Sequence, residues 1–365
     1  MTQTSDRLDA LRAKMAETNT NLVVLAPGAH MAWLLDVRPH ADERACLAFV
    51  SGTGAAFLMP ALEAESARTQ IDLPFFTWSD DTGPQAALKD VLADLHAHDA
   101  AVLVLDEAMR ADHAALVTDA LPNAVRRFTA DTVGALRMRK GADEYAALKR
   151  NAQIADRAMR GAWAAMHPGM SETQVAGIVR DNFAGDGATP LFTIIGAGPN
   201  GAFPHHHTGD TVLKDGDAVV MDIGAASEGY SSDITRMALI GDGPDGYAEV
   251  HDIVNRAVEA ALKAARPGVK AHVVDDAARG VIADAGYGDY FVHRTGHGLG
   301  TEVHEPPFIT ASSQTVLDEG MVFSIEPGIY LPGRFGIRLE EIVILRADGP
   351  EILSDLSRTP EKIND

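Results

Sequence analysis

The chain has 365 residues, of which 46% are hydrophobic and 23% charged, and its 31 basic against 52 acidic residues give a net charge of −21. This acidity argues against nucleic acid or an anionic membrane surface as a partner, because either would repel the protein. No run of about 18 apolar residues is present to span a membrane. The single cysteine, Cys46, excludes an internal disulfide framework and makes a cytoplasmic location the default.

The first third of the sequence alternates helical patterns with short apolar runs of strand length, which predicts an α/β domain. We expect this domain to cover residues 1–137, with the polar stretch 137–143 marking the boundary to a second domain over residues 138–365. Helices are predicted over 6–17 and 84–98, and strands over 21–27, 45–50, 55–59 and 100–106.

The second domain contains a repeat. A long helical pattern, a Pro-Gly turn and a second helix occur twice, with Pro168 and Pro267 at equivalent places. Ser171 and Gln174 have the spacing of a capping box at the start of the first copy's second helix. The repeat predicts a duplicated α+β unit with curved antiparallel strands on one side, and its active residues in the cleft between the halves.

Four acidic residues lie in short β-rich apolar runs that follow these helix pairs. A single acidic residue in a strand usually faces solvent, but an unpaired buried carboxylate is very costly. Four of them must therefore be protonated, paired with cations or bound to metal. Strands are predicted over 217–225, 227–240, 320–330 and 336–345, and they carry Asp222, Asp233, Glu326 and Glu340 in that order.

The segment GHGLGTEVHEPP, residues 296–307, combines two histidines with little side-chain bulk. Its glycines are expected to let the backbone approach a ligand closely. A lone histidine is more often structural, but in this company His297 is a good candidate for a metal ligand. Four carboxylates and one imidazole suit two divalent ions, Mn²⁺ or Co²⁺ first and Zn²⁺ also possible.

Four segments carry a resemblance to a known family: MDIGAASEGYSSDITR, HRTGHGLGTEVHEPP, SIEPGIY and GIRLEEIV. In their order and spacing the chain resembles the pita-bread metallopeptidases, peptidase family M24, and among them the Xaa-Pro dipeptidases (prolidases) and Xaa-Pro aminopeptidases. The resemblance implies a C-terminal pita-bread fold, the creatinase/aminopeptidase fold, with pseudo-twofold duplicated halves. It also implies, more loosely, a smaller creatinase-like α/β domain at the N-terminus.

The resemblance further implies a dinuclear metal centre and a reaction. Asp233 and Glu340 are similar to the family's bridging ligands, and a hydroxide between the two metals would attack the Xaa-Pro bond of a short peptide. Glu326 would also serve as the general base. The implied metal ligands are Asp222, Asp233, His297, Glu326 and Glu340.

The same resemblance assigns roles around the metals. His205 would act on the leaving nitrogen and His304 would contact the substrate or its tetrahedral intermediate. His293 and Arg338 would line the pocket, although Arg338 is equally plausible as a structural ion pair with a ligand carboxylate, and Tyr230 is a further candidate. His206 and His207, which follow His205, are expected to lie in a solvated loop.

The loop over residues 34–49 is similar to one that reaches a neighbouring active site in family dimers, so we expect a homodimer. His40 and Arg44 are candidates for contacting the substrate's terminus, but Ala41 and Asp42 interrupt the family pattern, and a solvated loop is an equal alternative. A metalloenzyme acting on a non-peptide substrate, such as a cyclic amide hydrolase or a sulfonium lyase, stays open. A metal-free creatinase-like hydrolase or a binding module fits the full ligand set less well.

Overall fold

The computed structural model describes residues 3–364 and divides into two compact units, residues 1–137 and 138–365. Each unit is described by itself. Among residues 3–364, none of the helices combines the length and the apolar content that crossing a membrane would require.

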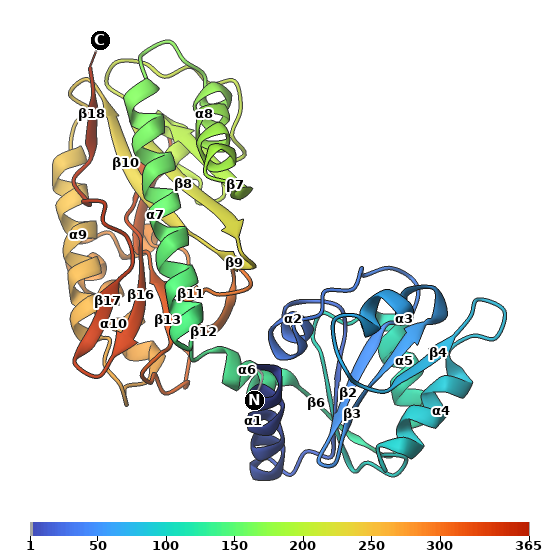
Figure 1. Cartoon of the computed structure of the whole chain (residues 1–365). Coiled ribbons are helices and arrows are strands. Elements are labelled where there is room, and N and C mark those ends of the chain that lie inside the picture. Colours follow the sequence, from blue (N-terminus) through green and yellow to red (C-terminus); the bar gives the residue numbers. More distant parts are fainter. Residues whose placement is uncertain (1–2, 365) are drawn as a thin grey trace. The chain divides into compact units, whose positions relative to one another are not determined.

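The first unit is built on one six-stranded sheet with the order β4-β3-β2-β1-β5-β6 (Figure 1). β1 pairs in parallel with β5 and antiparallel with β2. The helices are α1 (Gln3–Glu17), α2 (Ala29–Leu35), α3 (Ala61–Arg68), α4 (Gln85–Asp94), α5 (Ala111–Ala120) and α6 (Val133–Arg137), and the strands are β1 (Leu22–Leu25), β2 (Leu47–Ser51), β3 (Ala55–Pro60), β4 (Phe75–Trp78), β5 (Val102–Leu105) and β6 (Val125–Phe128).

Both faces of this sheet are buried, which explains why β1 is a continuous apolar run rather than an alternating one. Leu22 and Val24 belong to a hydrophobic core on one face, whereas Val23 and Leu25 belong to a second core on the other. The helices and strands predicted for this part of the chain are confirmed, with end positions that differ by a few residues.

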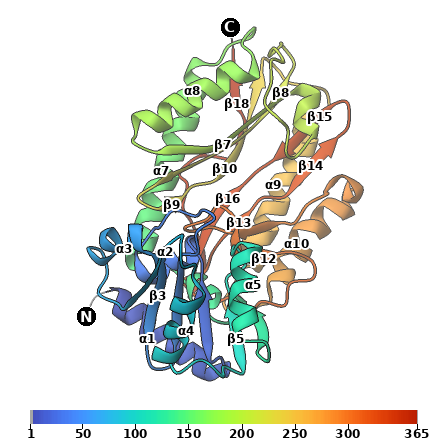
Figure 2. The same cartoon turned by 90° about the vertical axis from the view of Figure 1, so that its right-hand side faces the viewer.

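The second unit places its strands between two pairs of long helices (Figure 2). Two five-stranded sheets form: β18-β10-β8-β7 with β9 beside β8, and β12-β11-β13-β16-β17; β14 and β15 pair separately. The helices are α7 (Ala142–Ala165), α8 (Glu172–Gly185), α9 (Tyr247–Ala264) and α10 (Ala271–Asp284), and the strands are β7 (Thr189–Ala197), β8 (Ala218–Ser227), β9 (Tyr230–Ser231), β10 (Ile234–Ile240), β11 (Gly296–Gly298), β12 (Glu305–Ile309), β13 (Val322–Ile325), β14 (Gly328–Leu331), β15 (Phe335–Arg338), β16 (Glu341–Arg346), β17 (Gly349–Ile352) and β18 (Glu361–Ile363).

The two halves of this unit correspond in structure as the repeat predicted. α7 and α8 pack in one hydrophobic core, and α9 and α10 pack in another. The capping box is confirmed, because the Ser171 hydroxyl accepts from the Gln174 amide at 3.2 Å and the Gln174 side chain accepts from the Ser171 amide at 2.8 Å. Ser171 and Lys270, the residues just before α8 and α10, each form an isolated β-bridge to a later segment.

Three strand predictions were wrong, because each run holds two strands, which in the run 227–240 are β9 and β10. The run 320–330 is not one strand but two, β13 and β14, and the run 336–345 is likewise β15 and β16. β13 pairs with β16 in the five-stranded sheet, whereas β14 pairs with β15, so the chain leaves one sheet and later returns to it. The breaks fall at Glu326 and Glu340, and Pro327 has no amide hydrogen with which to continue a ladder. Asp233 also precedes β10 rather than lying within it.

A fully buried arginine joins the two halves. Arg236 of β10 is 1% exposed, and its guanidinium donates to the Glu341 carboxylate at 3.0 and 3.1 Å. It also donates to the carbonyl oxygens of Glu340, Leu356 and Ser357. One side chain therefore connects a strand of the first half to β16 of the second half and to the C-terminal segment.

We predict that Arg236→Met lowers the free energy of unfolding by about 3 kcal/mol, because it leaves a buried carboxylate and several carbonyl groups without a donor. This is the low end of the usual range, since Arg358 still donates to Glu341. Urea unfolding followed by circular dichroism measures it. Arg157→Ala, which breaks an exposed pair with Asp186, should cost less than about 1 kcal/mol. Equal effects of the two variants would contradict the prediction.

Candidate metal centre

The five predicted metal ligands come from both halves of the second unit and meet in one cavity of about 590 Å³. Asp222 lies in β8 and His297 in β11, whereas the other three stand at the ends or breaks of strands. The cavity is lined by Phe192, Ile194, Pro204, His205, Asp222, Asp233, His293, Arg294, His297, Val303, His304, Glu326, Arg338 and Glu340.

Two groups of ligand atoms that share Glu340 include all five residues, and atoms of Asp233 and His297 also lie within 4.8 Å of one another and of His304. In one group, oxygens of Asp222, Asp233 and Glu340 lie within 4.8 Å of one another. In the other, atoms of His297, Glu326 and Glu340 lie within the same limit. A carboxylate common to two adjacent ligand sets has the position of a bridge between two ions.

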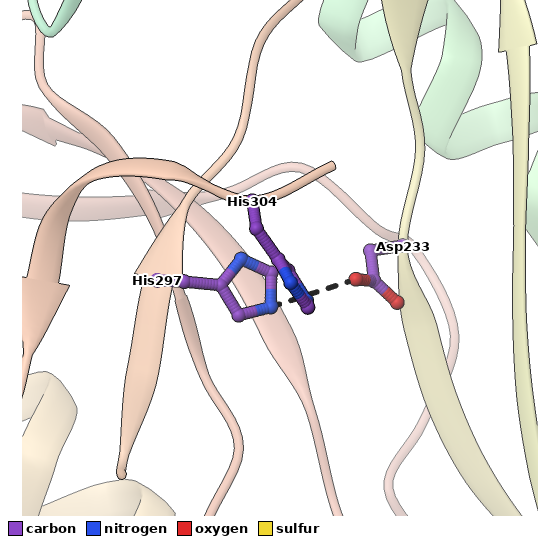
Figure 3. Close-up of side chains that lie close together, drawn as sticks. All are labelled: Asp233, His297 and His304. Carbon is purple, nitrogen blue, oxygen red and sulfur yellow. Dashed lines mark ion pairs between the residues drawn. The ribbon is translucent and has the colours of Figure 1, made fainter. Parts of the chain in front are cut away.

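The ring of His297 is held in one orientation by its contacts. Its Nδ1 donates to the carbonyl oxygen of Gly298 at 3.1 Å, which directs the Nε2 atom toward the carboxylates. Nε2 lies 3.1 Å from Glu326 Oε1 and 3.7 Å from Asp233 Oδ2, and Figure 3 shows the latter contact. A hydrogen on Nε2 can donate to Glu326 Oε1, and a metal ion would take the place of that hydrogen between the ring and the carboxylates.

The electrostatics of the carboxylates also fit cations. Burial, together with the charges of neighbouring carboxylates, raises the pKa of Asp233 and of Glu340 well above their ordinary values. Within the described residues, Asp222 Oδ1 and Glu340 Oε1 are buried without a hydrogen-bond partner. Buried oxygens of this kind are costly unless something binds them. Divalent ions are hard acids that would satisfy both.

Glu326 differs from the other carboxylates. Burial would raise its pKa, but contact with His297 and the charges of His293 and Arg338 bring the pKa of Glu326 down to about 2. The hydroxyl of Ser324 donates to Glu326 Oε1 at 2.9 Å. The pKa of Glu326 is thus shifted in the opposite direction from those of Asp233 and Glu340.

The glycines around His297 serve packing rather than access to a ligand, contrary to our expectation. A Cβ atom on Gly296 would lie 1.9 Å from the carbonyl oxygen of Ser324, and one on Gly298 would lie 2.3 Å from that of Pro306. Both distances are far below any real contact, so a side chain at either position would push apart the neighbouring segments that shape the site.

A buried ion pair supports the segment that carries His304. Lys140 Nζ lies 2.6 Å from Glu305 Oε1, and both side chains are 2% exposed. Gly300 leaves room for this carboxylate, because a Cβ there would lie 2.6 Å from Glu305 Oε1. Glu305 directly follows His304, so the pair fixes the backbone beside a pocket histidine.

Three histidines besides His297 line the cavity, and their surroundings differ. The His304 ring centroid lies 4.1 Å from that of His297 (Figure 3), and burial and nearby positive groups lower the pKa of His304 to about 4. Burial also lowers the pKa of His293; its Nδ1 donates to the Arg294 carbonyl, and its Nε2 lies 2.7 Å from the Tyr330 hydroxyl. His205 is exposed at the cavity.

Arg338 contacts a predicted ligand directly. It is 3% exposed, and its guanidinium donates to Asp222 Oδ2 at 2.5 Å and to the Tyr330 hydroxyl at 2.9 Å. Its Nε donates to the Thr235 hydroxyl, which in turn donates to Glu340 Oε2 at 2.9 Å. Sequence reasoning missed Tyr330 and Thr235, although both lie in the quoted segments, because no spacing rule marks a residue that holds a ligand.

Other candidates lie elsewhere. The Tyr230 hydroxyl donates to Glu144 at 3.1 Å, and Tyr230 is not among the residues that line the cavity. In the first unit His40 is exposed, and Arg44 donates to Asp80 at 3.0 Å. The expectation for His206 was wrong: it is only partly exposed, and its Nε2 lies 2.8 Å from a fully buried carboxylate of Glu172.

Comparison with known proteins agrees with this geometry. The model of Metallopeptidase family M24 matches residues 146–347, and that of the Creatinase/Prolidase N-terminal domain matches residues 7–139. The chain belongs to metallopeptidase family M24. This metallopeptidase is therefore a hydrolase, and the predicted pita-bread fold with a creatinase-type N-terminal domain is confirmed.

Relatives of this M24 metallopeptidase match almost its whole length. It is 38% identical to a probable dipeptidase, PepE, of Mycobacterium tuberculosis, over 94% of this chain and 92% of that one. It is 31% identical to the Xaa-Pro dipeptidase of Lactobacillus helveticus, over 94% and 95%. The crystal structure of dipeptidase PepE from Mycobacterium ulcerans superposes with a TM-score of 0.94 at 36% identity, covering 100% of this chain and 98% of that one.

We predict that Glu340→Gln makes the metal-free protein more stable at neutral pH, because it removes one of the mutually repelling buried charges. Folding raises the pKa of Glu340, so its contribution to stability is fully present below the unfolded value, near 4.3, and is lost as the pH rises through the folded value. The melting temperature of the metal-free variant at pH 7.5 should exceed that of the wild type by about 3 °C or more, and the difference should vanish near pH 4.

Adding Mn²⁺ should reverse this order, since the wild type gains the full stabilisation of metal binding and the variant does not. Glu249→Gln, at an exposed position on α9, is the control and should change neither melting temperature. A metal-free Glu340→Gln protein that melts below the metal-free wild type would show that the carboxylates do not repel as described.

Proposed function

We propose that this metallopeptidase cleaves Xaa-Pro bonds in short peptides, as a proline dipeptidase (prolidase) or an Xaa-Pro aminopeptidase. The observation that carries the proposal is the pair of ligand groups that share Glu340, together with unpartnered buried oxygens on two of their members. Polar groups that converge in this way beside an apolar wall are typical of a substrate site.

Five residues would hold two divalent metals, Mn²⁺ first and Co²⁺ or Zn²⁺ as alternatives. When bound, such a pair lowers the pKa of a water molecule that the ions share and polarises the scissile carbonyl. The residues are Asp222, Asp233, His297, Glu326 and Glu340.

The roles of the surrounding side chains follow from their contacts. Oε1 of Glu326 is engaged by Ser324 and His297, which leaves Oε2 to accept the proton from water. The pKa of His304 is lowered, which favours a neutral ring that would donate a hydrogen bond to the developing oxyanion. His205, exposed at the opening, would donate to the leaving nitrogen.

Proline selectivity is consistent with the cavity. An Xaa-Pro bond lacks an amide hydrogen, so its recognition must rely on shape and on groups other than a backbone acceptor. Phe192, Ile194 and Val303 line the cavity with apolar surface, against which a pyrrolidine ring can pack. The names of the full-length relatives favour dipeptides. The homodimer, the cytoplasmic location and the role of His40 stay predictions.

A panel of Ala-Pro, Ala-Pro-Ala and Ala-Ala tests the function. We expect Ala-Pro to be hydrolysed with the highest kcat/KM, and Ala-Ala at least about tenfold more slowly, since the apolar wall has less to pack against. Chelation should abolish activity and Mn²⁺ or Co²⁺ should restore it. Full activity in protein shown to be free of metal, or a preference for Ala-Ala, would refute the proposal.

A second experiment distinguishes the general-base role of Glu326 from the substrate contact of His304. Glu326→Gln should lower kcat by about 10²–10⁴-fold, because the amide cannot accept the water proton. It should also weaken one metal, so metal content is measured alongside the rate. His304→Ala should alter both kcat and KM and leave the metal content unchanged. If the Gln variant holds two metals and works at the wild-type rate, Glu326 is not the base.

A further inference from the structure

The loop between β7 and β8 carries three consecutive histidines, of which the proposed mechanism uses only the first. A short 3₁₀ helix, Gly198–Ala202, begins the loop, and the residues after it have no regular structure. His205 is exposed at the cavity, and no hydrogen bond of its ring to the described residues fixes its position. Its usefulness in catalysis therefore depends on what holds the backbone on either side of it.

One buried carboxylate accepts hydrogen bonds from several parts of this loop. Glu172, the first residue of α8, has a fully buried side chain. Its Oε1 accepts from the amide of Ala197 and the side chain of Asn200, both at 2.9 Å. Its Oε2 accepts from the amide of Gly209 at 3.0 Å and from the ring of His206 at 2.8 Å. The four donors span the loop from the strand before it to the residues after its histidines.

The contact with His206 lies directly beside the catalytic candidate. A carboxylate only accepts at this contact, so the hydrogen sits on His206 Nε2. On the other side of His205, Arg338 donates to the carbonyl oxygen of Pro204 at 3.3 Å. The backbone of His205 is thus held from both directions, by Glu172 through His206 and by Arg338 through Pro204.

We propose that Glu172 and His206 are positioning residues that hold His205 toward the leaving nitrogen of the substrate. This inference rests on the proposed function, in which His205 acts at that atom. A displacement of a catalytic group by about 1 Å can cost about 10²-fold in rate. Loss of a contact on the adjacent residue can therefore lower kcat measurably. The carboxylate at the start of α8 also interacts favourably with the helix dipole. The alternative is that Glu172 only stabilises the fold, and the experiments must distinguish this role from positioning of His205.

His206→Ala, His206→Gln and His207→Ala make a matched set. His206→Ala removes the donor to Glu172, whereas glutamine can place an amide hydrogen near the same point. His207 is exposed and has no hydrogen bond or ion pair to residues 3–364, so its variant is the control. We expect His206→Ala to lower kcat on Ala-Pro by about tenfold, within the range of a weakened acid–base group, with KM changed less than about threefold. His206→Gln and His207→Ala should stay near wild type with two metals bound.

A double-mutant comparison identifies the route of the effect. In a His205→Ala background, His206→Ala should cause no further loss, because an anchor that acts through His205 has nothing left to position. Multiplicative losses, or a wild-type kcat for His206→Ala, would overturn the inference. So would a wild-type kcat for His205→Ala, since there would then be no positioning to explain.

Hydrogen exchange gives a readout that does not depend on activity. The amides of residues 203–209 should exchange faster in His206→Ala and Glu172→Gln than in the wild type, whereas His207→Ala should leave them unchanged. If exchange is unchanged in all variants, the contact between Glu172 and His206 does not hold the loop. If the enzyme does not hydrolyse Xaa-Pro peptides but the variants still exchange faster, the proposed function and the catalytic role of His206 are refuted. The structural contact between Glu172 and His206 is then still supported.

Discussion

Repulsion among buried carboxylates is the constraint on which the rest of this structure depends. Asp222, Asp233, Glu326 and Glu340 meet in one cavity, where Arg338 donates to Asp222 and His297 contacts Glu326. In the absence of cations this arrangement opposes folding, so the surrounding scaffold must hold the acids in place. The halves joined by Arg236, and the hydroxyl of Thr235 on Glu340, are parts of that scaffold. If these residues hold metals, as we propose, the buried carboxylates repel one another until the metals bind.

The position of the acids along the chain follows from the same requirement. Glu326 and Glu340 lie where the chain passes from one sheet to another, and Asp233 stands just before its strand. A residue inside a regular ladder can point only up or down from the sheet. A residue at a break has freer backbone geometry, so the side chains of several strands can converge on one point. The breaks in the strands therefore allow the proposed ligands to converge.

Local and periodic signals predicted the α/β domain, the duplicated α+β unit and the acidic candidates, whereas the pita-bread fold and the roles of the ligands came from the resemblance to the family. Apolar runs, the capping box at Ser171 and the spacing of acids can all be read from neighbouring positions. The breaks at Glu326 and Glu340 could not be read, because continuous apolar runs hide a change of pairing partner that only long-range contacts decide. His206 was misjudged for a related reason: its partner, Glu172, lies 34 residues earlier, and nothing in the local pattern announces it.

The ion pair of Lys140 with Glu305 sets a practical limit on how the chain can be divided. The family match begins at residue 146, and a protein engineer who wished to express the catalytic unit by itself would naturally cut near there. Such a cut would discard Lys140 and leave a carboxylate that is 2% exposed without its cation, next to His304. A catalytic fragment should therefore begin before Lys140, upstream of the residues that match the family. The residues between the two domains stabilise the pocket through this ion pair.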